Sequence, residues 1–230
     1  MKKGNQKKSR KRNRLVSLLI ALALGIGICV STTQATAQTF NHNEISFTDA
    51  ILTNGLLLPA VGFGWISVHE SSHWLALRTE GYRVTAFEPY PTTTLSGNPV
   101  LGRTAWVAPI NNPPSDFVFM APAITDTVVY LTTDLLLSTS DSIMNNKLLS
   151  VSLWTAGMVV PWTDFSFNLL GGNDEWTTEW KYIGYPLAIL GLVEIVRQIV
   201  RIHSWQETKE TVSTSNIQYE FSGTSLTITW

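Results

Sequence analysis

The strongest constraint on this fold is an apolar run without one charged residue, from Ala50 to Val68, which ends directly at a charged cluster. Three further apolar segments follow, at 117–137, 148–170 and 182–200. Each is close to the roughly 20 residues that an α-helix needs to cross the hydrocarbon of a bilayer. The sequence therefore predicts a mainly α, polytopic membrane protein, a helical bundle of about four spans.

The overall composition also favours a membrane protein. Only 14% of the residues are charged, whereas soluble domains average roughly 25%. The net charge of -1 gives no reason to expect nucleic-acid binding. Acidic residues inside the apolar segments are costly in lipid, and they keep one alternative open, a soluble secreted protein with buried helices.

The N-terminus predicts a targeting segment. Basic residues crowd 1–14, an apolar stretch follows, and Ala35 and Ala37 then have the spacing of a cleavage signal. Residues 1–37 are thus a signal peptide cleaved after Ala37, or an uncleaved membrane anchor. In both cases the basic end stays cytoplasmic, and we expect an integral protein of the cell (plasma or inner) membrane.

The remaining chain divides into a membrane domain, 38–202, and a polar tail, 203–230. Between the first and second apolar segments, "GYRVTAFEPYP" and "RTAWVAP" alternate polar and apolar residues among Gly, Pro and Asn. This pattern predicts a short β-rich insert. The tail ends in "YEFSGTSLTITW", which predicts a β-hairpin around Gly223.

The charged cluster, "HESSH", has the spacing His-Glu-x-x-His. On a helix, residues four apart share one face, so His69 and His73 can direct two imidazole nitrogens at one Zn²⁺. Glu70 can then take a proton from a water that zinc has acidified. The alternative is a helix whose two histidines only form hydrogen bonds with neighbouring groups.

A catalytic zinc site usually has three protein ligands, so a third one must come from elsewhere in the chain. The best candidates are Asp164 and Asp174, at the end of the third apolar segment. With one span between them, the first and third segments run in the same direction. Their C-terminal ends then meet at one membrane face, where one metal ion could join them.

The order of these elements resembles the site-2 protease family of intramembrane zinc metalloproteases. The motifs that carry the resemblance are His-Glu-x-x-His, "GYRVTAFEPYP" from Gly81, "MAPAITD" and "NLLGGND". They extend over about residues 50–180. The resemblance implies a membrane-embedded zinc protease in which Asp174 is the third zinc ligand and Asn168 precedes it.

Two departures from the family pattern keep the third ligand open. Gly171 stands where the family has Pro, and Asn173, Asp174 and Glu175 stand where it has Leu-Asp-Gly. Asp174 is our first choice and Asp164 the alternative.

Three further polar residues have predicted supporting roles. Asn168 could orient substrate or a ligand carboxylate, or form an ordinary bond between helices. Asp126, on one helix face with Asp134, could face a cavity near the site. Glu194 is expected to pair with Arg197 or Arg201 at helical spacing.

The sequence thus predicts a zinc metalloendopeptidase that cleaves membrane-spanning or membrane-adjacent segments, with a membrane protein or peptide as its substrate. Glu70 would activate a zinc-bound water. Two other functions stay open: an inactive membrane scaffold with the same fold, motivated by the altered stretch around Asp174, and a soluble secreted zincin-like peptidase.

Overall fold

The computed structural model describes residues 45–94, 96–108, 112–170, 176, 178–215, 218–222 and 225–229. Within these ranges the protein is mainly α-helical with short β-hairpins, which confirms the predicted class. The predicted signal or anchor segment, 1–37, and Asp174 lie outside the described residues.

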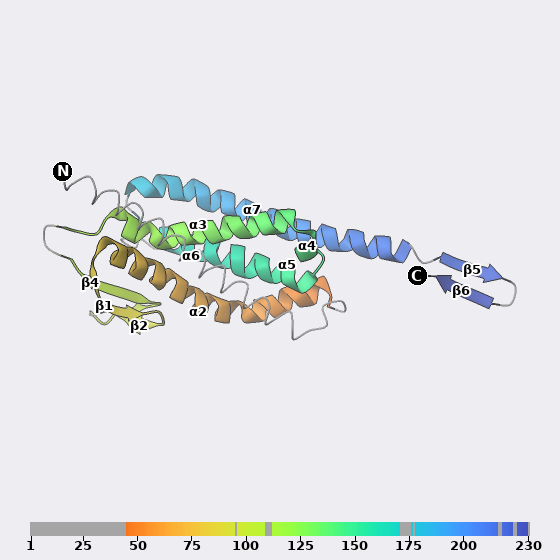
Figure 1. The fold of residues 1–230 in the computed structure, drawn as a ribbon, viewed down its shortest axis with the longest axis horizontal. Helices are drawn as coiled ribbons and strands as arrows, with labels where there is room; N and C mark the ends of the chain where they lie inside the picture. Colours follow the sequence, from red (N-terminus) through yellow and green to blue (C-terminus); the bar gives the residue numbers. More distant parts are fainter. Residues whose placement is uncertain are drawn as a thin grey trace, which may run out of the picture.

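The helices lie side by side, with α3 and α6 between α2 and α7 (Figure 1). The segment that carries α5 and α6 continues without a break through a π-helix, η1. The bounds are α2 Phe47–Glu80, α3 Asp116–Thr139, α4 Asp141–Met144, α5 Lys147–Trp154, η1 Thr155–Val159, α6 Val160–Leu170 and α7 Thr178–Ser215.

Helix α2 has well-defined signals at both ends. Ser46 caps its N-terminus by accepting a hydrogen bond from the Asp49 N–H at 3.0 Å. At the C-terminus Gly81 adopts a φ of 87°, a left-handed conformation that glycine takes without a steric penalty. The chain turns there directly into the β insert, so the His-Glu-x-x-His cluster lies close to the strands.

The predicted insert is present as two small antiparallel pairs. Strand β1 (Arg83–Glu88) pairs with β4 (Arg103–Val107), and β2 (Thr92–Thr93) pairs with β3 (Pro99–Val100). A register shift between Val84 and Ala86 marks a bulge in β1. The β1–β4 pair packs against the C-terminal half of α2 (Figure 1).

The predicted C-terminal hairpin is also present, as β5 (Gln218–Ser222) paired with β6 (Ser225–Thr229). It lies at the end of α7, at the opposite end of the molecule from β1 and β4 (Figure 1). The predicted boundary at 202/203 falls inside α7, which continues to Ser215. No Gly or Pro follows Gly191 in this helix, and Glu, Lys and Gln favour its continuation.

Within the described part of the chain, two helical segments are long and apolar enough to cross a membrane, Phe47–Glu80 and Glu179–Thr208. In each segment, only 17% of the most apolar stretch of 18 residues is buried inside the protein. Such helices differ from the core helices of a soluble protein, because most of their apolar side chains face outward. Examples are Leu56, 84% exposed, and Leu190, 64% exposed.

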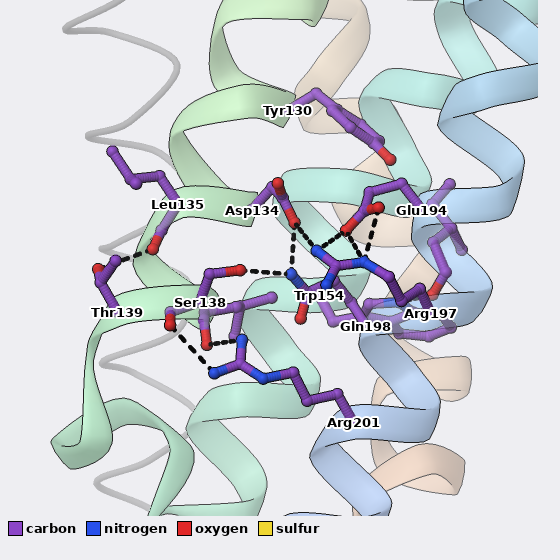
Figure 2. A network of polar contacts seen from close by, with 12 residues as sticks. Tyr130, Asp134, Leu135, Ser138, Thr139, Trp154, Glu194, Arg197, Gln198 and Arg201 are labelled. Atoms are coloured by element: carbon purple, nitrogen blue, oxygen red, sulfur yellow. Dashed lines mark hydrogen bonds and ion pairs between the residues drawn. The ribbon is translucent and has the colours of Figure 1, made fainter.

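Helix α7 is attached to α3 through a polar network (Figure 2). Gln198 donates to Asp134 and, at 2.8 Å, to the Ser138 hydroxyl. Arg201 donates to the backbone carbonyls of Leu137 and Ser138 at 2.9 and 3.0 Å. The network therefore gives partners to the Arg201 guanidinium and to the Gln198 side-chain N–H groups, which would otherwise face apolar surroundings, whereas Gln198 Oε1 is buried with no hydrogen-bond partner within the described residues.

The predicted pairing of Glu194 is confirmed, since Arg197 Nε donates to both carboxylate oxygens (Figure 2). Aromatic donors extend the attachment along α7. Their partners are α7 backbone carbonyls: Trp162 Nε1 donates to Ala188 at 2.7 Å, Tyr130 Oη to Gly191 at 2.8 Å and Trp154 Nε1 to Ile195 at 2.9 Å.

The π-helix η1 ends two residues before Pro161, the second residue of α6. Proline lacks the N–H that would bond to the carbonyl four residues earlier, and π-turns occur where an α-helix must absorb such an interruption. The same turn packs closely on α3. A Cβ on Gly157 would lie 2.7 Å from Thr133 Cγ2 and 2.9 Å from its Cβ, so only glycine fits at this crossing.

We predict that Gly157→Ala destabilises the protein by about 1–3 kcal/mol, the usual cost of an overpacked core. The matched control is Gly62→Ala on α2, where an added Cβ meets nothing within 4 Å. That control should retain or raise stability, because alanine favours helix more than glycine does. Thermal unfolding in detergent compares the two variants. Equal midpoints would contradict the close α3–η1 contact.

Candidate functional site

The site is centred on a contact between α2 and α6. His69 Nδ1 lies 2.8 Å from Asp164 Oδ2, although the two residues are 95 positions apart in the sequence. This contact confirms the expectation that the C-terminal halves of the first and third segments converge. A histidine, a glutamate and an aspartate of the predicted set therefore lie in one region of the molecule.

His73 is held by the backbone of α3. Its Nδ1 donates to the Val118 carbonyl oxygen at 2.8 Å, and the side chain is buried. A carbonyl only accepts, so the proton is on Nδ1 and the neutral ring carries its lone pair on Nε2. The centroids of the His69 and His73 rings lie 5.1 Å apart, and the two rings have a T-shaped arrangement.

His69 has the corresponding arrangement. When Nδ1 donates to the Asp164 carboxylate, the lone pair of the neutral ring is again on Nε2. Hydrogen bonds from Nδ1 to a carboxylate or a carbonyl are the usual way in which metal-ligating histidines are oriented. With Nδ1 donating, each imidazole would bind an ion through Nε2.

Asn168, one turn after Asp164, supports the aspartate. Its Nδ2 donates to the Asp164 backbone oxygen at 2.9 Å and to Oδ1 at 3.1 Å. These bonds join Asn168 to the carboxyl of an aspartate in its own helix. Asp164 therefore has one oxygen on His69 and the other on Asn168, which restricts its rotation.

Asp126 of α3 lies beside this pair. The Trp65 indole N–H donates to its Oδ1 at 2.8 Å, while Oδ2 is buried and has no hydrogen-bond partner within the described residues. The Asp126 carboxyl also interacts electrostatically with Asp164 and His69. Asp126 is therefore a neighbour of the His69–Asp164 pair.

A cavity of about 440 Å³ extends from Asp126 along α3, α6 and α7. Asp134 also lines it, so the two α3 aspartates share a cavity, as their spacing predicted. Most of its other lining residues are apolar, among them Trp162, Phe165 and Leu190.

Glu70 lies under the β insert, against Gly102 and Thr104. Its carboxyl is buried, and Thr104 of β4 donates to Oε2 at 2.6 Å. Gly102, just before β4, allows this close approach, because a Cβ there would lie 2.7 Å from Glu70 Oε1. The predicted base is therefore enclosed between α2 and β4.

The donor set fits a zinc site in part. Two oriented imidazoles are present, but no group of three His, Cys, Asp or Glu side chains in the described ranges is arranged to hold a metal ion. Asp174 is outside those ranges. Glu80 accepts from the Ser115 N–H at 3.1 Å, which leaves it at the start of α3, away from the two histidines.

Glu88, the last residue of β1, is engaged in a cross-strand pair. Arg103 Nη2 lies 2.9 Å from Glu88 Oε1. Hydrogen bonds from Arg103 and Thr92 lower the pKa of Glu88, so this carboxylate is charged at neutral pH and holds β1 to β4.

Sequence reasoning missed three residues that shape the site. Trp65 had a usable signal, because it precedes His69 by four residues and so shares the face of the histidines. The sequence around Thr104 and Gly102 contains no signal that would place them at the site. Their role depends on how β4 lies on α2, and no local pattern encodes that contact.

Comparison of the chain with protein-family models, with curated proteins and with solved structures found no match in any of the three. The resemblance to the site-2 protease family consequently rests on the quoted sequence motifs alone.

Proposed function

We propose that this protein is a membrane-embedded zinc metalloendopeptidase of the site-2 protease type. The observation that carries the proposal is the contact of His69 with Asp164, together with the Nδ1 bond of His73 to Val118. The two bonds orient two helical imidazoles in the same tautomer beside a buried glutamate, an arrangement that zinc peptidases require.

In this proposal His69 and His73 hold zinc through Nε2, and Asp174 is the third ligand. Zinc, when bound, polarises the scissile carbonyl and makes a water more acidic. Asp164 serves as the group that orients His69, because its Oδ2 already accepts from Nδ1. Asn168 holds Asp164 in place through the bond to Oδ1.

Glu70 is the general base. It takes a proton from the attacking water and later delivers it to the leaving amine. Its burial between α2 and β4 keeps bulk water away from the carboxyl. A glutamate that only stabilised the fold would not need to lie next to two oriented imidazoles.

The outward-facing apolar surfaces of α2 and α7 support insertion in a bilayer. We propose that α3 and the continuous helix from α5 to α6 complete four spans. Each contains 24 residues, about 36 Å at the α-helical rise. That length exceeds the roughly 30 Å of the hydrocarbon core.

The proposed substrate is a membrane-spanning or membrane-adjacent segment of another protein. A helical segment hides its carbonyls in backbone hydrogen bonds, so it must unwind locally before cleavage. The β1–β4 pair has two strand edges and packs next to the helix that carries Glu70. An unwound segment could add to such an edge as a further strand.

For the membrane assignment, we predict that the full chain stays in the membrane pellet after washing with alkaline carbonate and is released only by detergent. The physical reason is the large apolar area that α2 and α7 present outward. Immunoblots of the fractions measure the distribution. Release by carbonate would favour the soluble, secreted zincin-like alternative.

For the metal site, we predict that Asp174→Ala loses stoichiometric zinc, because it removes a ligand. Asp164→Ala should keep zinc with an affinity about 10- to 100-fold lower, as expected when a group that orients a ligand is removed. Metal content of purified protein and competition with a chelator measure both effects.

The matched control is Asp141→Ala, an exposed aspartate at the start of α4, which should bind zinc like the wild type. Complete loss of zinc in Asp164→Ala with full retention in Asp174→Ala would reverse the two roles. Absence of zinc from the wild type would reject the metal centre itself.

For the base, we predict that Glu70→Gln abolishes cleavage of transmembrane-segment peptides in detergent micelles while zinc content is unchanged. Glutamine keeps the size of the side chain but cannot accept a proton. The matched control is Glu179→Gln, at the start of α7. Undiminished cleavage by Glu70→Gln would contradict the assigned role. A zinc-bound wild type that cleaves no peptide would favour the inactive scaffold.

A further inference from the structure

We infer that Thr104 is a positioning residue that holds the Glu70 carboxyl for catalysis, and that the β1–β4 pair thereby controls the orientation of the base. The inference rests on the proposed function, since it assigns a partner to the proposed general base. It concerns β4, a part of the molecule to which no motif drew attention.

The first support is the hydrogen bond itself. Thr104 Oγ1 donates to Glu70 Oε2 at 2.6 Å and lies 3.2 Å from the Glu70 backbone oxygen. The shorter distance is typical of a hydroxyl bonded to a charged carboxylate. Both side chains are buried, with 8% of Thr104 and 7% of Glu70 exposed. Water therefore competes little for this bond.

The second support is steric and independent of the hydroxyl. A Cβ added to Gly102 would lie 2.6 Å from Glu70 Cγ, 2.7 Å from Oε1 and 2.9 Å from Ile66 Cγ2. Gly102 and Thr104 are two residues apart, so in an extended chain they face the same side. The side of the segment that Gly102 and Thr104 share thus packs directly against the Glu70 side chain. This packing restricts the rotamers that Glu70 can adopt.

The third support is the anchoring of this segment. Arg103, between Gly102 and Thr104, bonds to Glu88 of β1 at 2.9 Å. The Ser67 hydroxyl donates to the Pro89 carbonyl at 3.2 Å, which ties the end of β1 to α2 about one turn before Glu70. β4 is therefore bonded to β1, and the end of β1 is tied to α2 about one turn before the glutamate, which limits the movement of Thr104.

A role in positioning makes a specific demand on side-chain chemistry. Serine supplies the same hydroxyl donor, whereas valine has the shape of threonine without a donor. In Thr104→Val the carboxyl keeps its space but loses its hydrogen bond, and it can leave the productive orientation. In Thr104→Ser the bond is retained. A purely structural threonine would tolerate valine at least as well as serine.

The first experiment measures kcat, KM and zinc content of Thr104→Val and Thr104→Ser. We expect Thr104→Val to lower kcat about 10- to 100-fold, as follows from losing a hydrogen bond to a charged group. KM and zinc content should stay at the wild-type level, and Thr104→Ser should stay within about threefold of wild-type kcat, as expected when the hydroxyl donor is kept. The matched control is Thr85→Val, the same change at an exposed position of β1, with wild-type kcat expected.

The second experiment is independent of activity and of metal. Glu70 in the metal-free protein is labelled with a hydrophobic carbodiimide and quantified by mass spectrometry. We expect Thr104→Val to label several-fold faster than the wild type, because its carboxyl is no longer held against β4. Thr104→Ser and Thr85→Val should label at the wild-type rate. Gly102→Ala, which displaces Glu70 sterically, should resemble Thr104→Val.

The possible results separate the two proposals. Wild-type kcat and wild-type labelling in Thr104→Val would overturn the positioning role and leave the peptidase intact. A zinc-loaded wild type that cleaves nothing would overturn the peptidase and, with it, any catalytic positioning by Thr104. A loss in Thr104→Val that Thr104→Ser shares equally would also overturn the inference, because the hydroxyl would then not be the cause.

Discussion

The arrangement of the site depends on one bond between distant parts of the chain, that of His69 with Asp164. It joins the helix that bears the His-Glu-x-x-His cluster to the third helical segment and fixes the tautomer of one imidazole. Trp65, Asp126 and Asn168 surround the pair and hold its members in place. Without this bond the two histidines would be only neighbours on one helix.

Several features were accessible from sequence because they have local causes. Uncharged apolar runs predicted the helices, alternation predicted the strands, and a spacing of eight predicted that Asp126 and Asp134 share one helix face; both line the same cavity. The pairing of Glu194 with Arg197 also follows from helical spacing alone. The continuation of α7 to Ser215 does not follow from the apolar run at 182–200, because the residues after it are polar and only their helix propensity favours a helix.

What sequence could not supply are contacts set by tertiary packing. Nothing in "LGRTAWV" indicates that Thr104 meets Glu70, since this depends on the path of β4 over α2. Equally, nothing local in the sequence indicates that Asp164 lies 2.8 Å from Nδ1 of His69. Local patterns name the groups that are able to bind a metal, and packing decides which of them contact each other.

The π-helix before Pro161 has a consequence for this packing. Its five-residue hydrogen bond, from the Val160 N–H to the Thr155 carbonyl, inserts one residue relative to a regular α-helix. One residue corresponds to about 100° of rotation about the axis. If α5 continued regularly into α6, the angular phase of every later side chain would change by that amount, and Asp164 would be turned away from α2. The π-helix thus sets the direction, about the helix axis, in which the Asp164 side chain extends toward His69.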